Sequence, residues 1–145
     1  MYKHILIPTD GSDLSWMAVR QGIALAKSMN ARVTALTVSP TFRTVTVDPD
    51  MVADTPEQYR NDCEAAAARY LGAATESAKV MGVPCEGVHV VNDHPHQAII
   101  DTAHGKGCDL IFMASHGRRG VSALLLGSET TKVLTHSKIP VLVYR

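Results

Sequence analysis

Five short apolar runs alternate along the chain with four segments of helical character, and this alternation constrains the fold more than any other feature. Consecutive parallel strands need a long crossover connection, which is usually a helix. The alternation therefore predicts an α/β fold: a five-stranded parallel sheet with helices on both faces. We expect strands at 4–8, 31–38, 83–91, 110–113 and 139–144, and helices after residue 12, at 55–81, from 92 to 104 and at 129–136.

The helical segments carry recognisable start and stop signals. Ser12 or Asp13 can cap the first helix, whereas Thr55 followed by Pro56 opens the second, which Gly82 ends. The first helix has two apolar sides, and the second has one alanine-rich stripe that suits close packing on the sheet. The two sides are Leu14, Met17, Ala18, Leu25 and Met29, and Trp16, Val19 and Ile23; the stripe is Ala67, Leu71, Ala74, Ala78 and Met81.

Length and composition bound the class of protein. The chain of 145 residues fits one domain, 1–145, and its 46% apolar and 19% charged residues are typical of a globular protein. Its formal net charge of zero argues against nucleic acid as a partner. No apolar run approaches the length of a membrane span, and the first one ends too early for a signal peptide. Three widely spaced cysteines favour a reducing, cytoplasmic compartment.

Residues 110–128 contain the strongest functional signal. The apolar run from Leu110 ends in Ala114-Ser115-His116-Gly117, nine residues follow, and Gly127-Ser128 then precedes a helix. Small residues let the backbone approach a ligand closely, and free N–H groups at a helix start attract anions such as phosphate. Arg118 and Arg119 add positive charge to the same loop. An ordinary strand-to-helix loop with a serine cap is the alternative interpretation.

This loop resembles the nucleotide-binding motif of the universal stress protein family, which is Gly, two residues, Gly, nine residues, and Gly-Ser or Gly-Thr. The resemblance covers the whole chain, from Lys3-His4-Ile5-Leu6-Ile7-Pro8-Thr9-Asp10-Gly11-Ser12 to Pro140-Val141-Leu142-Val143. It implies a single Rossmann-like domain whose first and fourth strands are neighbours, so that the turns after both line one crevice. In such sheets a ligand binds beyond the carboxyl ends of the strands, where the strand order reverses.

The resemblance also implies an adenine nucleotide as ligand, ATP with Mg²⁺ or Mn²⁺ on its phosphates, and a regulatory role in stress tolerance. The base is expected near Val38, and Asp10 could bind ribose hydroxyls or a metal, although it could equally serve only as a cap. We expect the nucleotide to contact fourteen positions: Pro8, Thr9, Asp10, Val38, Met113, Ala114, Ser115, His116, Gly117, Arg118, Arg119, Gly127, Ser128 and Glu129.

Two residues depart from what ATP would favour. Ala114 replaces the first glycine of the motif, which costs little if the glycine serves close approach and more if a positive φ is needed. Glu129 follows Gly127-Ser128 directly, and its charge would repel phosphates unless it points away or helps to bind a divalent ion. A carboxylate in the first turn of a helix is also favourable by itself.

The sequence gives little indication of a metal site or of an enzyme active site. His94 and His96 flank Pro95 beside Asp93, but no second ligand group stands at metal-binding spacing, so surface histidines are the better interpretation. The chain has neither a Walker A motif, nor G-x-G-x-x-G, nor a G-x-S-x-G nucleophile elbow. Any ATP hydrolysis should be slow, because no general base is evident. The alternatives are a nucleotide-free interaction protein of the same fold and a slow ATP hydrolase.

The last strand and the longest connection carry two further expectations. Proline near the start of 139–144 favours an edge strand, and its apolar run Val141–Tyr144 lacks the lysine or bulge that usually protects an edge. We therefore expect a homodimer through Val141–Tyr144, as the family resemblance also implies. The connection 39–54 is the candidate moving part of a ligand response.

Overall fold

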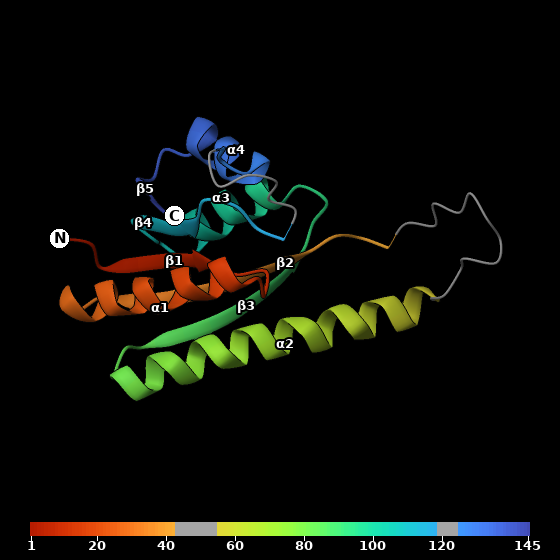
Figure 1. Ribbon diagram of the computed structural model, residues 1–145, viewed down its shortest axis with the longest axis horizontal. Helices are drawn as coiled ribbons and strands as arrows, with labels where there is room; N and C mark the ends of the chain where they lie inside the picture. Colours follow the sequence, from red (N-terminus) through yellow and green to blue (C-terminus); the bar gives the residue numbers. More distant parts are fainter. Residues whose placement is uncertain (43–54, 119–124) are drawn as a thin grey trace.

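The computed structural model describes residues 1–42, 55–118 and 125–145, and within these ranges the chain alternates strictly between strands and helices (Figure 1). The alternation predicted from the sequence is confirmed. Residues 43–54, which make up most of the predicted moving connection, lie outside the described residues. The elements in chain order are β1 (His4–Pro8), α1 (Asp13–Ser28), β2 (Arg32–Ser39), α2 (Pro56–Met81), β3 (Cys85–Val91), α3 (Pro95–Gly105), β4 (Leu110–Ala114), α4 (Ser128–His136) and β5 (Val141–Tyr144).

The strands form one parallel sheet in the order β3-β2-β1-β4-β5. In β1, Ile5 lies opposite Val33 of β2 on one side and opposite Leu110 of β4 on the other. The strand order therefore reverses between β1 and β4, and the prediction that these strands are neighbours is confirmed. β5 forms one edge of the sheet, also as predicted, and β3 forms the other.

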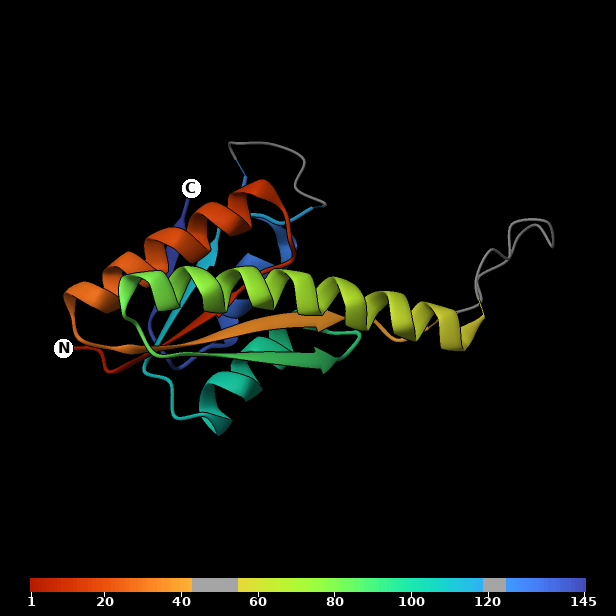
Figure 2. The same ribbon diagram turned by 90° about the horizontal axis from the view of Figure 1, so that it is seen from below.

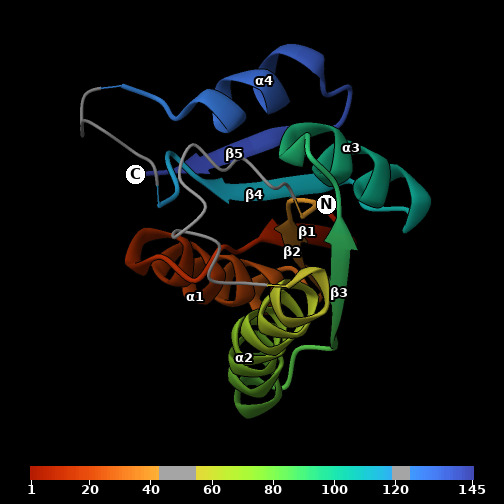
Figure 3. The same cartoon turned by 90° about the vertical axis from the view of Figure 1, so that its right-hand side faces the viewer.

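Helices cover both faces of the sheet: α1 and α2 lie on one face, and α3 and α4 on the other (Figure 3). Alternate side chains along each strand point to opposite faces, so the core divides into two clusters. Ile5, Ile7 and Phe112 belong to the cluster under α1 and α2. Leu6 and Ile111 belong to the cluster under α3 and α4.

Both apolar sides predicted for α1 pack against the core, with the exception of Met17. Met17 is 48% exposed, whereas Val19 and Ile23 are fully buried. A Cβ atom on Gly22 would lie only 3.2 Å from Cδ1 of Phe112, so the helix packs close to the sheet. Close packing selects small and β-branched residues over large ones. The buried stripe is Ser15, Ala18, Val19, Gly22, Ile23 and Ala26.

Helix α2 begins and ends as its signals predict. The Thr55 side chain accepts a hydrogen bond from the Gln58 N–H at 3.1 Å, and Gly82 ends the helix in the left-handed conformation, with φ of 72°. The alanines of the predicted stripe are buried, and Leu71 packs beside them. The first turns of α2 extend past the ends of the strands (Figure 2).

The last strand is shorter than predicted. It begins at Val141 rather than at 139, because Ser137 and Ile139 form a local turn in which the Ser137 hydroxyl bonds both the N–H and the carbonyl of Ile139. Pro140 then enters the strand without an N–H to donate. Strand β3 likewise begins after Pro84, at Cys85.

Two further observations concern the described ranges as a whole. None of the helices in these ranges is long and apolar enough to cross a membrane. The three cysteines are free thiols, and Cys108 is buried. Burial raises the pKa of the Cys108 thiol to about 11, so it stays protonated at neutral pH.

Candidate functional site

The turns that follow β1 and β4 contact each other where the strand order reverses. The Arg118 backbone N–H donates to Oδ2 of Asp10 at 3.0 Å, and Nε of Arg118 donates to the Asp10 carbonyl oxygen at 2.8 Å. The prediction that the two turns lie side by side is therefore confirmed. In sheets of this kind, this is where ligands bind.

Asp10 is held as an anion within its turn. Its Oδ1 accepts a hydrogen bond from the Ser12 N–H at 2.9 Å. Burial by itself raises the pKa of this carboxyl group, but the hydrogen bonds from Ser12 and Arg118 outweigh burial and bring the pKa below its ordinary value. The carboxylate thus stabilises the turn ahead of α1, while Ser12 caps that helix through a hydrogen bond from the Ser15 N–H.

Gly117 stands directly against the Asp10 carboxylate. A Cβ atom at this position would collide with Oδ2 of Asp10. Any side chain here would displace the Asp10 carboxylate, so this glycine leaves room for the contact between that carboxylate and the β4 turn.

Tyr70 of α2 completes this corner and was not anticipated from the sequence. Its ring lies over Gly11, where a Cβ atom would collide with it. Nη2 of Arg118 donates to the Tyr70 hydroxyl at 2.8 Å, and the Arg118 guanidinium carbon lies 5.6 Å from the ring centroid. Tyr70 stands outside the alanine stripe of α2, so nothing in the local sequence connected it with this site.

Gly127, just before α4, contacts the residues that follow β4. The Gly127 N–H donates to the carbonyl oxygen of buried Ser115 at 2.7 Å. A Cβ atom on Gly127 would lie 3.0 Å from Cα of His116 and 3.2 Å from the Ser115 carbonyl oxygen. The end of β4 and the start of α4 are therefore in tight backbone contact.

Helix α4 starts without a capping side chain. Gly127 occupies the N-cap, and in the described ranges no acceptor bonds the N–H groups of Ser128, Glu129 and Thr130. These groups form the positive end of the helix dipole. An anion such as phosphate fits this arrangement, because it would supply the missing acceptors and meet a favourable field.

Ala114 fits the fold without strain. It is the last residue of β4, and Asn30 alone among the described non-glycine residues has a positive φ. The Ala114 carbonyl oxygen accepts a hydrogen bond from the Thr130 hydroxyl at 3.0 Å. The substitution of alanine for the motif glycine therefore carries no backbone penalty here.

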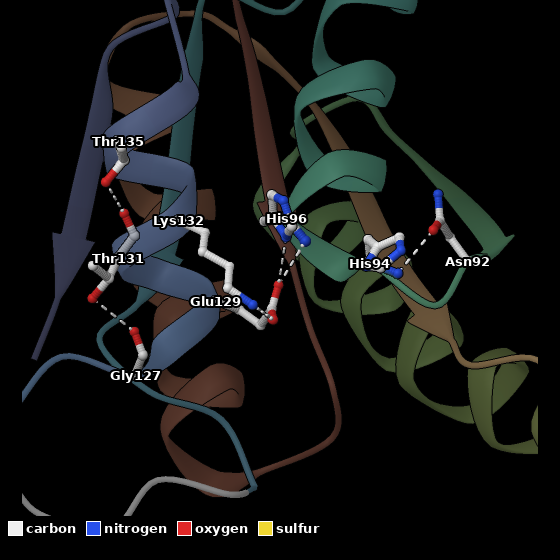
Figure 4. A network of polar contacts seen from close by, with 8 residues as sticks. All are labelled: Asn92, His94, His96, Gly127, Glu129, Thr131, Lys132 and Thr135. Carbon is white, nitrogen blue, oxygen red and sulfur yellow. Dashed lines mark hydrogen bonds and ion pairs between the residues drawn. The ribbon is translucent and has the colours of Figure 1, made fainter.

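The Glu129 carboxylate is turned toward α3 (Figure 4). Its Oε2 accepts hydrogen bonds from the N–H of His96 at 2.8 Å and from Nδ1 of His96 at 3.1 Å, and its Oε1 pairs with Nζ of Lys132 at 3.2 Å. Burial acts to raise the pKa of Glu129, but the contacts from His96 and Lys132 outweigh it, so the pKa lies below its ordinary value. The carboxylate is thus directed to protein partners.

The remaining predicted positions lie at strand ends. Pro8 ends β1, and the following Thr9 is held by backbone bonding to β2, its N–H donating to the Leu36 carbonyl at 2.8 Å. Met113 and Val38 direct their side chains to the core cluster under α3 and α4, so they can meet a ligand mainly through backbone atoms. Arg119 lies outside the described residues.

No group of three or more His, Cys, Asp or Glu side chains in the described ranges could hold a metal ion. His94 and His96 stand with ring centroids 6.2 Å apart, and Nδ1 of His96 is bonded to Glu129. A hollow of about 460 Å³ lies at the opposite end of the sheet, between the end of α2 and the start of β3. Its lining includes Lys79 and Cys85, and it is remote from both turns.

Comparison with known proteins adds the following findings. The model of the universal stress protein family matches residues 1–145. Universal stress protein YxiE of Bacillus subtilis is 32% identical over 149 aligned residues, which cover 100% of both chains. The solved structure of MJ0577 from Methanocaldococcus jannaschii has a TM-score of 0.81 at 29% identity, covering 99% of this chain and 95% of that one. A crystal structure of a universal stress protein in complex with cAMP has a TM-score of 0.71 at 27% identity, covering 99% and 97%.

Proposed function

Because this chain belongs to the universal stress protein family, we propose that it binds an adenine nucleotide and acts as a ligand-responsive regulator in the stress response. The ligand of choice is ATP, with Mg²⁺ or Mn²⁺ on its phosphates. The observation that carries this proposal is the start of α4, where the N–H groups of Ser128, Glu129 and Thr130 have no acceptor within the described ranges. A similar protein, 27% identical, was crystallised with cAMP, which supports the adenine class of ligand.

In the proposed complex the residues divide by the part of the nucleotide that they hold. The N–H groups at the start of α4, together with the Ser115–Gly117 turn, bind the phosphates. Arg118 adds charge beside them. Asp10 faces the ribose, and the backbone at Val38 lies beside the base. Pro8, Thr9, Met113 and Ala114 contribute backbone atoms that line the site.

The proposed role is binding rather than rapid turnover. Fast phosphoryl transfer requires a residue that orients the attacking water. Among the described site residues, the carboxylates of Asp10 and Glu129 already accept hydrogen bonds from protein groups. Hydrolysis is therefore expected to be slow, and the ligand acts by favouring one state of the protein over another.

A nucleotide-free interaction protein is the second candidate, and one observation favours it. Asp10 and Glu129 put two carboxylates into the proposed site, and for each the pKa lies below its ordinary value because protein hydrogen bonds outweigh burial. Two fixed negative charges oppose a highly charged ligand. A slow ATP hydrolase is the third candidate function.

Two further properties belong to the proposal. The apolar edge strand β5, in which Leu142 is 38% exposed, would pair with its copy across a twofold axis and give a homodimer. The free thiols of Cys63, Cys85 and Cys108 favour a reducing compartment and hence the cytoplasm.

The test separates nucleotide binding from the nucleotide-free interaction protein. Purified protein is denatured, and the released material is chromatographed with detection at 260 nm. Protein stripped of ligand is then titrated calorimetrically with ATP, with and without Mg²⁺. The proposal expects an adenine nucleotide in the first experiment or saturable one-site binding in the second. Absence of both would leave the interaction protein as the better interpretation.

A further inference from the structure

The start of α3 is capped by a residue of another helix. His94 occupies the N-cap of α3 but makes no side-chain capping bond. Glu129 of α4 supplies the acceptor instead. Its Oε2 accepts hydrogen bonds from the backbone N–H and from ring Nδ1 of His96 (Figure 4). The backbone N–H of the same Glu129 is one of the three at the start of α4 that have no acceptor among the described residues. One residue thus links the beginnings of two helices.

The pairing fixes the protonation states that are possible. An ionised carboxylate can only accept, so Nδ1 of His96 carries a hydrogen and donates it. A second proton would enter at Nε2 and make the ring a cation. His96 is partly buried, with 18% of its side chain exposed, so its charge is only partly screened by solvent.

The charged neighbours of His96 can be enumerated in the described ranges. From α4 they are Glu129, Lys132, which pairs with that carboxylate, and His136, whose ring centroid is 6.0 Å from that of His96. On its own segment the ionisable neighbours are His94 and, three residues before His96, Asp93, whose carboxylate accepts hydrogen bonds from Thr41. Strand β2 also packs on α3, but its last four residues, 36–39, contain no ionisable group.

The charge of this cluster bears directly on the start of α4. The Glu129 carboxylate is within a side-chain length of the Glu129 N–H, well inside the Debye length of roughly 8 Å at physiological salt. With His96 neutral, the carboxylate is offset by Lys132 alone. With His96 protonated, the cluster carries one more positive charge, and repulsion of an incoming phosphate decreases.

We propose that the Glu129–His96 pair controls how strongly the start of α4 attracts the phosphates of a nucleotide, so that affinity increases when His96 takes up a proton. This inference rests on the proposed function and names a regulator of the same site. The pKa of Glu129, which lies below its ordinary value, supports it because the carboxylate stays ionised over the range in which imidazoles titrate. Glu129 and His96 are therefore positioning and charge-setting residues rather than catalytic ones.

The experiment measures the ATP dissociation constant between pH 5.5 and pH 8.5 for four proteins. These are the wild type, His96→Gln, Glu129→Gln, and the matched control His94→Gln. His94 lies on the same segment as His96, but in the described ranges its side chain does not bond Glu129. Comparison at each pH cancels the titration of ATP itself. Circular dichroism confirms that each variant is folded, and glutamine at 129 keeps an acceptor for the His96 N–H.

The wild type and His94→Gln should gain roughly three- to fivefold more affinity on acidification than His96→Gln, as expected for a partly exposed charge pair. Glu129→Gln should bind at least as tightly as the wild type at pH 8.5, because it removes the negative charge beside the start of α4. If ATP binds but all four pH profiles are parallel, this inference is wrong and the proposed function stands. If the wild type binds no nucleotide at any pH, both this inference and the proposed function are wrong.

Discussion

At the scale of single residues, the site depends on glycines that stand in contact with other backbone or polar groups. Gly117 meets the Asp10 carboxylate, and Gly127 meets the backbone of Ser115 and His116. Asp10 is distant from Gly117 in the sequence, and Ser115 and His116 are separated from Gly127 by a loop. The glycines therefore determine how closely the strand ends and the helix start approach one another.

Gly127→Ala should weaken nucleotide binding by about tenfold while the protein remains folded. The added methyl group would lie 3.0 Å from Cα of His116, so the turn after β4 must move away from α4. Overpacking of this kind costs about 1–3 kcal/mol, and part of it falls on the site. Calorimetric titration with ATP measures the effect. Gly105→Ala is the matched control, because nothing lies within 4 Å of its Cβ position; equal affinity of both variants would remove this contact from the site.

His4 provides a separate prediction about pH and stability. Burial, and then the positive charge of Arg32, lower the pKa of His4 below its ordinary value, and its Nδ1 has no partner in the described ranges. The unfolded chain then binds more protons than the folded one, so the free energy of unfolding should decrease as pH falls through about 6.5.

Urea unfolding at pH 7.5 and at pH 5.5 tests this for His4→Gln. The variant should lose less stability on acidification than the wild type, at about 1.4 kcal/mol for each unit of pKa difference that it removes. His104→Gln, which changes an exposed histidine of α3, is the control and should behave like the wild type. A loss in His4→Gln equal to that of the wild type would contradict the assignment.

At the scale of elements, the sequence predicted the type and order of every strand and helix that the structure describes. Periodicity and capping signals are local, so Thr55, Pro56 and Gly82 were sufficient to bound α2. The two apolar sides of α1 were predicted correctly except for Met17, but periodicity could not show that Gly22 packs closely on Ile7 and Phe112. The motif identified both turns of the site, but Tyr70 and the His96–Glu129 contact arise only when distant segments meet.

The packing of α1 leads to a prediction about Gly22. Its Cβ position is in contact with Ile7 and Phe112, in the middle of the core under α1 and α2. Gly22→Ala should destabilise the protein by about 1–3 kcal/mol, although alanine is the better helix former. Gly72→Ala in α2, which has open space around it, should be neutral or stabilising by up to about 1 kcal/mol. Denaturant unfolding compares them, and a stabilised Gly22→Ala would contradict the packing of α1.

At the scale of the whole molecule, the sheet has two edges, formed by β5 and β3. β5 exposes Leu142, and Leu134 of α4 is also exposed, at 41%. Edge strands with apolar side chains tend to pair with another chain. The sequence could identify β5 as an edge through Pro140, but it could not show which edge of a parallel sheet meets a second copy.

Leu142→Lys should convert the predicted dimer to a monomer, because it places a charge at the pairing edge of β5. Val91→Lys is the matched control: Val91 is 57% exposed on β3, the opposite edge strand. Light scattering at tens of micromolar protein should give a dimeric mass for the wild type and for Val91→Lys. A dimeric, folded Leu142→Lys protein would place the interface elsewhere, and a monomeric wild type would exclude the dimer.

The central claim is that an adenine nucleotide binds with its phosphates at the start of α4. The most direct test follows the backbone amide resonances of ¹⁵N-labelled protein during titration with Mg-ATP. We predict saturable shifts that are largest at Ser128, Glu129, Thr130 and Gly117, with smaller ones at Gly11. Unchanged spectra at millimolar ATP would contradict the claim, as would shifts confined to Thr75, Lys79 and Cys85 around the hollow at the other end of the sheet.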